Sequence, residues 1–235
     1  MRIPGPLRDA TFVERPNRFL TVVEIGDTQV ESHLPDPGRL KELLVPGARL
    51  KVRKVFRENS SPRKTEWTTV MVKTGHQWVS IDSTLPNRFV ASLLKGGDLP
   101  MFKGYRLVQT EIKQGHHRFD FLLEKDGELM YLEVKSVTLV IEGVAMFPDA
   151  VTSRGARHMM GLMDLAESGF EAGALFVCQR GDVTLFRPHW NRDPAFAAAL
   201  LAAAKNGVRV WAISAHVEPP HIRFRREIPY DLIPF

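Results

Sequence analysis

Three charged side chains interrupt two strand-like apolar runs near the middle of the chain. The stretch MYLEVKSVTL, residues 130–139, carries Glu133 and Lys135, and the stretch RFDFLLE, residues 118–124, carries Asp120 between two phenylalanines. Side chains of a strand alternate between its two faces, so Glu133 and Lys135 point the same way. Only a short turn separates the two runs, and antiparallel pairing would bring Asp120 close to Glu133.

This group has the composition of a metal-dependent phosphodiesterase site. Two carboxylates in a partly buried place repel each other, and a hard divalent cation such as Mg²⁺ or Mn²⁺ removes the conflict. Asp120 and Glu133 are therefore the predicted catalytic metal ligands, and Lys135 would hold the scissile phosphate or help to activate the attacking water. Glu111 would add a third carboxylate, unless it is a solvated strand end near Lys113. The alternative for Glu133 and Lys135 is an ordinary surface ion pair.

Cationic side chains elsewhere predict contacts with DNA. Arg154 and His158 are four residues apart near the start of an expected helix, where they suit a DNA phosphate; a surface pair is the alternative. The run RLKVRKVFR predicts a strand whose cationic face follows a nucleic-acid backbone, or else a plain solvated face. The cations of that face are Arg49, Lys51 and Arg53.

Two loops contribute further candidates. Arg39 follows the proline-rich turn of HLPDPGRL, whose backbone could bind an anion, although an ordinary barrel loop is the simpler interpretation. Asp149, in FPDAVTSRG, either caps the helix that follows it or joins the acidic group.

The elements that must position these residues change character along the chain. Up to about residue 82 the sequence consists of short strand-like segments separated by Pro, Gly and Asn, which favours a small barrel or sandwich. The predicted strands cover residues 11–13, 19–25, 28–32, 49–56 and 68–72. Beyond residue 82 strands alternate with helices, which predicts a mixed α/β sheet with right-handed crossovers.

Three helices are predicted in this second part. The first is LPNRFVASLLKGG with Asn87 as its N-cap, and the others cover about 152–169 and 193–206. The predicted strands between and around them are 105–111, 118–123, 130–139, 172–179 and 208–214.

Composition limits the class of protein. Among 235 residues, 32 Lys plus Arg against 27 Asp plus Glu give a net charge of +5, which suits an anionic partner. Cys178 is the single cysteine, which excludes an internal disulfide and a thiolate metal cluster. The first residues lack an apolar signal core and no apolar run approaches the roughly 20 residues of a membrane span, so we expect a cytoplasmic protein without membrane contact.

The motifs resemble those of a known family. Asp120 with Glu133-Val134-Lys135 resembles the Asp and Glu-x-Lys pattern of PD-(D/E)XK nucleases, with Phe119 where that pattern has proline. More narrowly, RFDFLLE, YLEVKSVTL and FPDAVTSRGARH, together with HLPDPGRLKELLVPG in the first half, resemble the sugar fermentation stimulation protein A family over about residues 7–225.

The resemblance implies a two-domain α+β chain. Residues 1–82 would form an OB-like β-barrel that binds nucleic acid, and residues 83–235 a restriction-endonuclease-like α/β domain with a mixed central sheet. It also implies a DNA-binding role, since the family is described as regulating sugar metabolism through DNA. In HLPDPGRL, Leu34 and Asp36 stand where members of the family often have Cys and Asn, so this loop departs from the family pattern.

Two functions from different classes follow. The first is a DNA-binding nuclease that uses Mg²⁺ or Mn²⁺, and the second is a non-catalytic DNA-binding transcriptional regulator of sugar metabolism. The intact Asp, Glu and Lys favour the nuclease, because carboxylates without a metal repel phosphate. A small-molecule enzyme ranks last, since no glycine-rich phosphate loop is present. The sequence leaves open single- or double-stranded DNA, and a homodimer is among the oligomeric states we consider.

Overall fold

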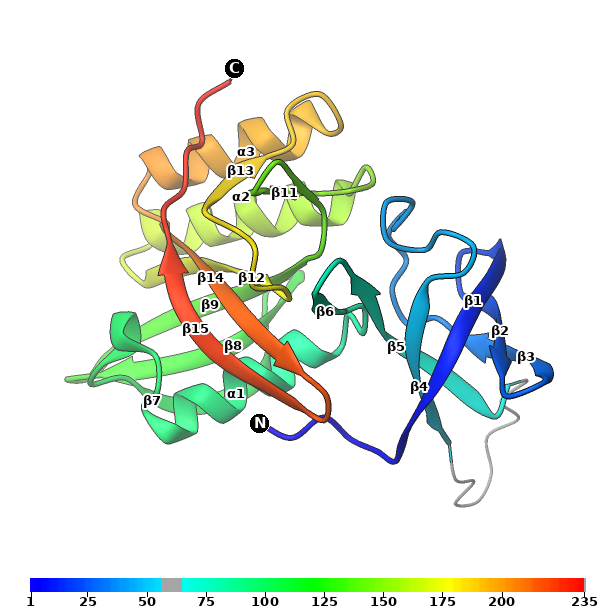
Figure 1. Cartoon of the computed structure of the whole chain (residues 1–235). Helices are drawn as coiled ribbons and strands as arrows, with labels where there is room; N and C mark the ends of the chain where they lie inside the picture. Colours follow the sequence, from blue (N-terminus) through cyan, green and yellow to red (C-terminus); the bar gives the residue numbers. More distant parts are fainter. Residues whose placement is uncertain (56–64, 235) are drawn as a thin grey trace.

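The computed structural model describes residues 1–55 and 65–234 and contains a β-barrel followed by a mixed sheet with helices on both faces (Figure 1). The barrel strands are β1 (Leu7–Asn17), β2 (Leu20–Ile25), β3 (Thr28–His33), β4 (Arg49–Lys54), β5 (Trp67–Thr74) and β6 (Gln77–Ser80). They are hydrogen-bonded in the order β3-β2-β1-β4-β5-β6, and β3 also pairs with β5, which closes five strands into a barrel. The predicted OB-like barrel is thereby confirmed.

Alternation along β4 explains how the barrel acquires its core. Leu50 and Val52 are fully buried inside, while the cationic residues that alternate with them, Arg49, Lys51 and Arg53, lie on the outer side. This is the expected period of a strand that has one face on a core and one in water. Phe56, the last residue of the strand predicted here, lies outside the described residues.

The second part is built on a six-stranded sheet in the order β15-β14-β12-β9-β8-β7. The strands are β7 (Arg106–Gln114), β8 (His117–Lys125), β9 (Glu128–Val137), β12 (Glu171–Cys178), β14 (Arg209–Glu218) and β15 (His221–Ile228). β9, β12 and β14 are mutually parallel and the outer pairs are antiparallel, so the sheet is mixed, as predicted.

Helices cover both faces of this sheet (Figure 1). α1 (Leu85–Gly96) packs on one face, and α2 (Ser153–Glu167) and α3 (Pro194–Lys205) pack on the other. A short 3₁₀ helix, η1 (Pro100–Phe102), follows α1, and the strands β10 (Val140–Ile141), β11 (Val144–Phe147) and β13 (Leu185–Pro188) form a small third sheet. Within the described residues, none of the helices combines the length and the apolar character needed to cross a bilayer.

Side-chain caps fix the starts of two helices. Thr152 accepts a hydrogen bond from the Gly155 amide at 3.0 Å, and Asp193 accepts one from the Phe196 amide at 3.0 Å. The prediction that Asn87 caps α1 is wrong: the N-cap residue is Thr84, three residues earlier, and it makes no side-chain capping bond. Pro86 in the first turn accounts for the earlier start, because its fixed φ favours that position.

The barrel and the sheet share apolar core and are also joined by hydrogen bonds. Val70 and Met71 of β5 pack in one cluster with Phe89 of α1 and Ile213 of β14. Residues 1–3, which precede the barrel, bond to the β14–β15 turn, with the Ile3 amide donating to the Pro220 carbonyl at 2.7 Å. At the other end of the barrel, the Ser80 amide donates to the Gln179 carbonyl at 3.2 Å. The barrel is therefore attached to the sheet on both sides along the chain.

Candidate active site

The β8–β9 hairpin brings Asp120 and Glu133 side by side. The register pairs Phe121 with Leu132, which sets the two acidic residues opposite each other on neighbouring strands. The Val134 amide donates to Asp120 Oδ2 at 2.7 Å and the Asn87 side-chain amide donates to Asp120 Oδ1 at 2.6 Å. Two donors from different elements therefore hold this carboxylate in place.

The position of Asp120 is electrostatically unfavourable for its negative charge. Burial and the neighbouring charge of Glu133 raise the pKa of Asp120, and the Val134 amide, Lys135 and Asn87 lower it, with a net pKa of about 6. At neutral pH the carboxyl group is nevertheless ionised. Two carboxylates then stand close together in a partly buried place.

Glu133 has one saturated and one orphaned carboxylate oxygen. Oε1 accepts from Lys135 Nζ and from His158 Nδ1, both at 2.5 Å. Oε2 is buried and has no hydrogen-bond partner among the described residues. Burial by itself would raise the pKa of Glu133, but the hydrogen bond from His158 and the charge of Lys135 outweigh it and leave this pKa below its usual value. Glu133 is therefore a fixed anion with an unused acceptor.

Arg154, His158 and Glu133 are connected in that order by hydrogen bonds. Arg154 donates through Nε to His158 Nε2 at 3.3 Å, so the other ring nitrogen of His158 carries the proton that Glu133 accepts. We expected His158 to face a DNA phosphate; in the structure it is buried, and both ring nitrogens are engaged inside the protein. Arg154 is exposed at the start of α2.

Two side chains of the site, Asp120 and Glu133, carry oxygen atoms that suit a hard divalent cation. Carboxylate oxygens are the ligands that Mg²⁺ and similar ions prefer, and a cation would satisfy the orphaned Glu133 oxygen and relieve the repulsion from Asp120. Glu111 lies on β7 opposite Asp120, because the register pairs Thr110 with Phe121 and Ile112 with Phe119. Its side chain is exposed and its backbone is left-handed (φ 54°). Within residues 1–55 and 65–234, no three Asp, Glu, His or Cys side chains are gathered closely enough to hold a metal ion.

Two residues of the cationic face of β4, Arg49 and Lys51, line a groove between the barrel and the β14–β15 turn. Lys51 bonds to Asp9 at 2.8 Å and lies 5.4 Å from the ring centre of Trp78, while Arg53 is 3.8 Å from Asp82. Arg49 is exposed at the start of the strand. The groove has a volume of about 470 Å³. Part of the predicted positive charge on this face is therefore balanced by neighbouring acids.

Asp149 and Arg39 join the two parts of the chain. The Arg39 amide donates to Asp149 Oδ2 at 2.8 Å, so Asp149 bonds to the barrel loop. The structure shows neither of the two roles considered for Asp149, helix cap or member of the acidic group; its carboxylate bonds to the barrel loop instead. The cap of α2 is Thr152.

Comparisons with known proteins match both parts of the chain. The model of the SfsA N-terminal OB domain matches residues 13–81, and that of the sugar fermentation stimulation protein RE domain matches residues 84–221. The chain belongs to the sugar fermentation stimulation protein family. The two matched segments together cover more than half of its residues and correspond to the barrel and to the mixed sheet with its helices.

Individual members of this family are similar over almost the whole chain. A sugar fermentation stimulation protein homolog of Moorella thermoacetica is 44% identical over 220 residues, which cover 93% of this chain and 94% of the relative. One from Chloroflexus aurantiacus is 41% identical over 243 residues, which cover 100% and 93%. The solved structure of Pyrococcus furiosus SfsA in complex with Ca²⁺ is 28% identical, with a TM-score of 0.88 over 98% of this chain and 99% of that one.

Proposed function

We propose that this chain is a DNA-binding protein that cleaves phosphodiester bonds with the help of Mg²⁺ or Mn²⁺. The observation that carries the proposal is the orphaned, buried Oε2 of Glu133 next to the ionised Asp120. A protein that only binds DNA gains nothing from two carboxylates that repel phosphate. A cation bound between the two carboxylates and the substrate would explain why both acidic groups are present. The Ca²⁺ complex of Pyrococcus furiosus SfsA supports the proposal, because it is a relative that binds a divalent cation.

In this proposal Asp120 and Glu133 are the residues that hold the metal ion. When bound, the ion would polarise the scissile phosphate and lower the pKa of an attacking water. The remaining roles belong to the side chains around it. Lys135, fixed by its bond to Glu133, provides a positive charge for the phosphate, and His158 keeps Glu133 oriented through Oε1. Asn87 and the Val134 amide hold Asp120.

DNA is the proposed polymer because positive charge is distributed over both parts of the chain. The net charge is +5, and exposed cations lie on the barrel, on its loop and at the start of α2. The residues proposed to contact the DNA backbone are Arg39, Arg49, Lys51, Arg53 and Arg154. Contacts of this kind supply affinity without reading sequence.

The test is an incubation of the purified protein with labelled single-stranded and duplex DNA in Mg²⁺, Mn²⁺ or EDTA, with Asp120→Ala as the control. A native gel of the same samples reports binding. We expect cleavage that requires a divalent cation and is lost in Asp120→Ala. Binding without cleavage in either metal would reject the nuclease.

A second candidate is a non-catalytic DNA-binding regulator that keeps the fold for binding alone. One observation favours it: among the described residues, Asp120 and Glu133 have no third acidic, His or Cys partner for a metal ion. Glu111 is the residue proposed to complete the set, since it lies across from Asp120 on β7. Under the regulator hypothesis, Asp120→Ala would bind DNA as well as the wild type and neither would cleave it.

Arg154→Ala is predicted to weaken DNA binding and to flatten its salt dependence. Loss of one phosphate contact lowers the slope of log affinity against log salt by about 0.9. The measurement is a series of fluorescence-anisotropy titrations in EDTA at several salt concentrations. Lys95→Ala removes an equal charge from the last turn of α1, on the opposite face of the sheet, and should leave the slope unchanged. An unaltered slope in Arg154→Ala would limit Arg154 to its bond with His158.

A further inference from the structure

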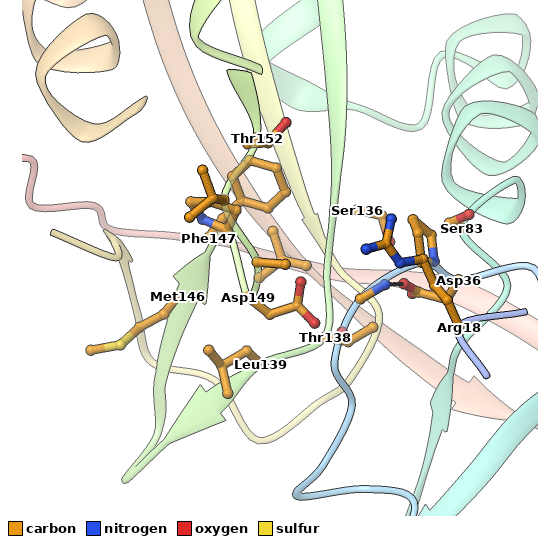
Figure 2. Close-up of a pocket in the computed structure, with 16 residues that line it drawn as sticks. Arg18, Asp36, Ser83, Ser136, Thr138, Leu139, Met146, Phe147, Asp149 and Thr152 are labelled. Atoms are coloured by element: carbon orange, nitrogen blue, oxygen red, sulfur yellow. Dashed lines mark hydrogen bonds between the residues drawn. The ribbon is translucent and has the colours of Figure 1, made fainter. Parts of the chain in front are cut away.

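A cavity of about 360 Å³ lies between the barrel and the sheet, next to the candidate site along the chain (Figure 2). The barrel contributes Arg18 and the loop 36–38, and the sheet part contributes 136–139 and 146–152. Ser136, the first of these, directly follows Lys135 on β9. A ligand in this cavity would therefore lie beside the strand that carries the proposed catalytic residues.

Two carboxylates line the cavity from opposite sides (Figure 2). Asp36 is 7% exposed; its Oδ1 accepts from the Gly38 amide at 2.7 Å, and its other oxygen has no hydrogen-bond partner among the described residues. Asp149 reaches the same point, because a Cβ on Gly38 would clash with the carboxylate oxygens of both residues. Burial and the charge of Asp149 raise the pKa of Asp36, and the Gly38 amide lowers it, with a net pKa of about 7. Each of the two carboxylates thus has one oxygen bonded to a backbone amide and a second oxygen that could accept from a ligand.

The outer side of this cavity is cationic. A groove of about 610 Å³ shares Arg18, Gly38 and Ala150 with it and is also lined by Arg39 and Lys41. Arg18, Arg39 and Lys41 are exposed, and the structure gives them no ion pair with any described residue. A ligand that is anionic at one end and carries hydrogen-bond donors at the other matches this separation of charge.

We propose that the cavity and the groove together bind one unpaired nucleotide of a DNA strand. Its phosphate lies against Arg18, Arg39 and Lys41, and the exocyclic amino group of its base donates to Asp36 and Asp149. This inference rests on the proposed function and specifies its substrate: a strand with a free base beside the scissile bond.

The chemistry of the bases gives the site a preference. Adenine, cytosine and guanine carry an exocyclic amino group, and aspartate accepts from the amino group of cytosine in known DNA complexes. Thymine presents carbonyl oxygens on either side of its one N–H, and these would repel the two carboxylates. Leu139, Met146 and Phe147 provide apolar contact for the faces of the ring. A base inside a duplex has its amino group engaged, so entry requires a single strand or a base turned out of the stack.

The test compares fluorescent oligo-dC and oligo-dT of equal length by anisotropy, in EDTA and near pH 8, where the Asp36 carboxyl is ionised. Backbone and stacking contacts alone tolerate every base. We expect the wild type to bind oligo-dC about ten-fold more tightly than oligo-dT. This factor lies in the lower part of the range of discrimination that one well-formed base contact provides. Asp36→Ala should lose this preference and keep its affinity for oligo-dT.

Two further variants separate base recognition from damage to the fold. Ala150→Trp fills the shared wall of the cavity and the groove without removing a carboxylate, and should also lose the preference. Asp27→Ala removes an equal charge from the exposed β2–β3 turn and should retain it. Equal wild-type affinity for both oligonucleotides, or a full preference in Ala150→Trp, would overturn the proposal.

Cleavage of the same oligonucleotides in Mn²⁺, beside Asp120→Ala, tests the proposed function separately. Metal-dependent cleavage without any base preference would overturn the nucleotide site and leave the nuclease intact. A wild-type protein that binds neither oligonucleotide would overturn the nucleotide site, and the incubation with duplex DNA would then decide the nuclease.

Discussion

Glu133→Gln is expected to abolish metal-dependent cleavage while leaving DNA affinity within a few-fold of the wild type. Glutamine keeps the shape of the side chain and an oxygen for His158 and Lys135, but it replaces the orphaned Oε2 with an amide nitrogen that cannot bind a cation. Electrostatic groups at reacting centres are worth roughly 10²–10³-fold in rate, so we expect a loss of at least this size. The measurement is single-turnover cleavage of labelled DNA in Mn²⁺, with affinity determined in EDTA.

Glu124→Gln is the matched control, because it makes the same exchange on β8 at a residue that bonds to Arg106 at the surface. Its cleavage rate should equal that of the wild type. If Glu133→Gln cleaves at the wild-type rate, Glu133 has no part in the reaction and its burial is structural.

Asp120→Asn is expected to make the metal-free protein more stable above about pH 6 and to eliminate cleavage. The folded-state pKa of Asp120 is raised to about 6 from 3.8, so the folded protein binds this proton more tightly than the unfolded chain does. Ionisation of Asp120 therefore destabilises the fold, by on the order of 2–3 kcal/mol, and this loss develops as pH rises from about 4 to about 6. Asparagine removes that charge, and its oxygen can still accept from the Val134 amide.

Urea unfolding in EDTA at about pH 8 and about pH 4 checks this sign. The variant should exceed the wild type at the higher pH and match it at the lower one. Added Mn²⁺ should stabilise the wild type and leave the variant unchanged, because the ion competes with the proton for the same carboxylate. A variant that is less stable than the wild type at both pH values would show that Asp120 stabilises the fold through its hydrogen bonds, and would contradict the proposed conflict of charges.

The part of the site that sequence predicts well is the part made by local structure. Asp120, Glu133 and Lys135 lie on two strands joined by a tight turn, and the two-residue period of a strand decides which side chains share a face. The strand-rich first part and the alternating second part follow from the same periodicities. Pairing between β3 and β5 closes the barrel through residues far apart in the chain, and no local pattern records it.

The contacts that the sequence does not predict depend on the orientation of the helices on the sheet. Asn87 lies 33 positions before Asp120, and its bond to that residue exists because α1 packs across the sheet. A polar residue near a helix start favours a cap, and only tertiary packing distinguishes a cap from a contact with the sheet. His158 similarly points inward because of the orientation of α2, so an expected surface residue becomes the partner of Glu133. The meeting of Asp36 with Asp149 requires the placement of one part of the chain on the other.

The attachment of the barrel at several points determines how the nucleotide cavity can be entered. A body hung from one flexible linker can swing in any direction, whereas a body held at several points over a shared apolar core keeps its orientation. Here the attachments are the residue 1–3 segment on the β14–β15 turn, Ser80 on Gln179 and Arg39 on Asp149. The loop 36–38 forms one wall of the cavity, so the cavity is largely preformed and a nucleotide would enter it without a swing of the barrel.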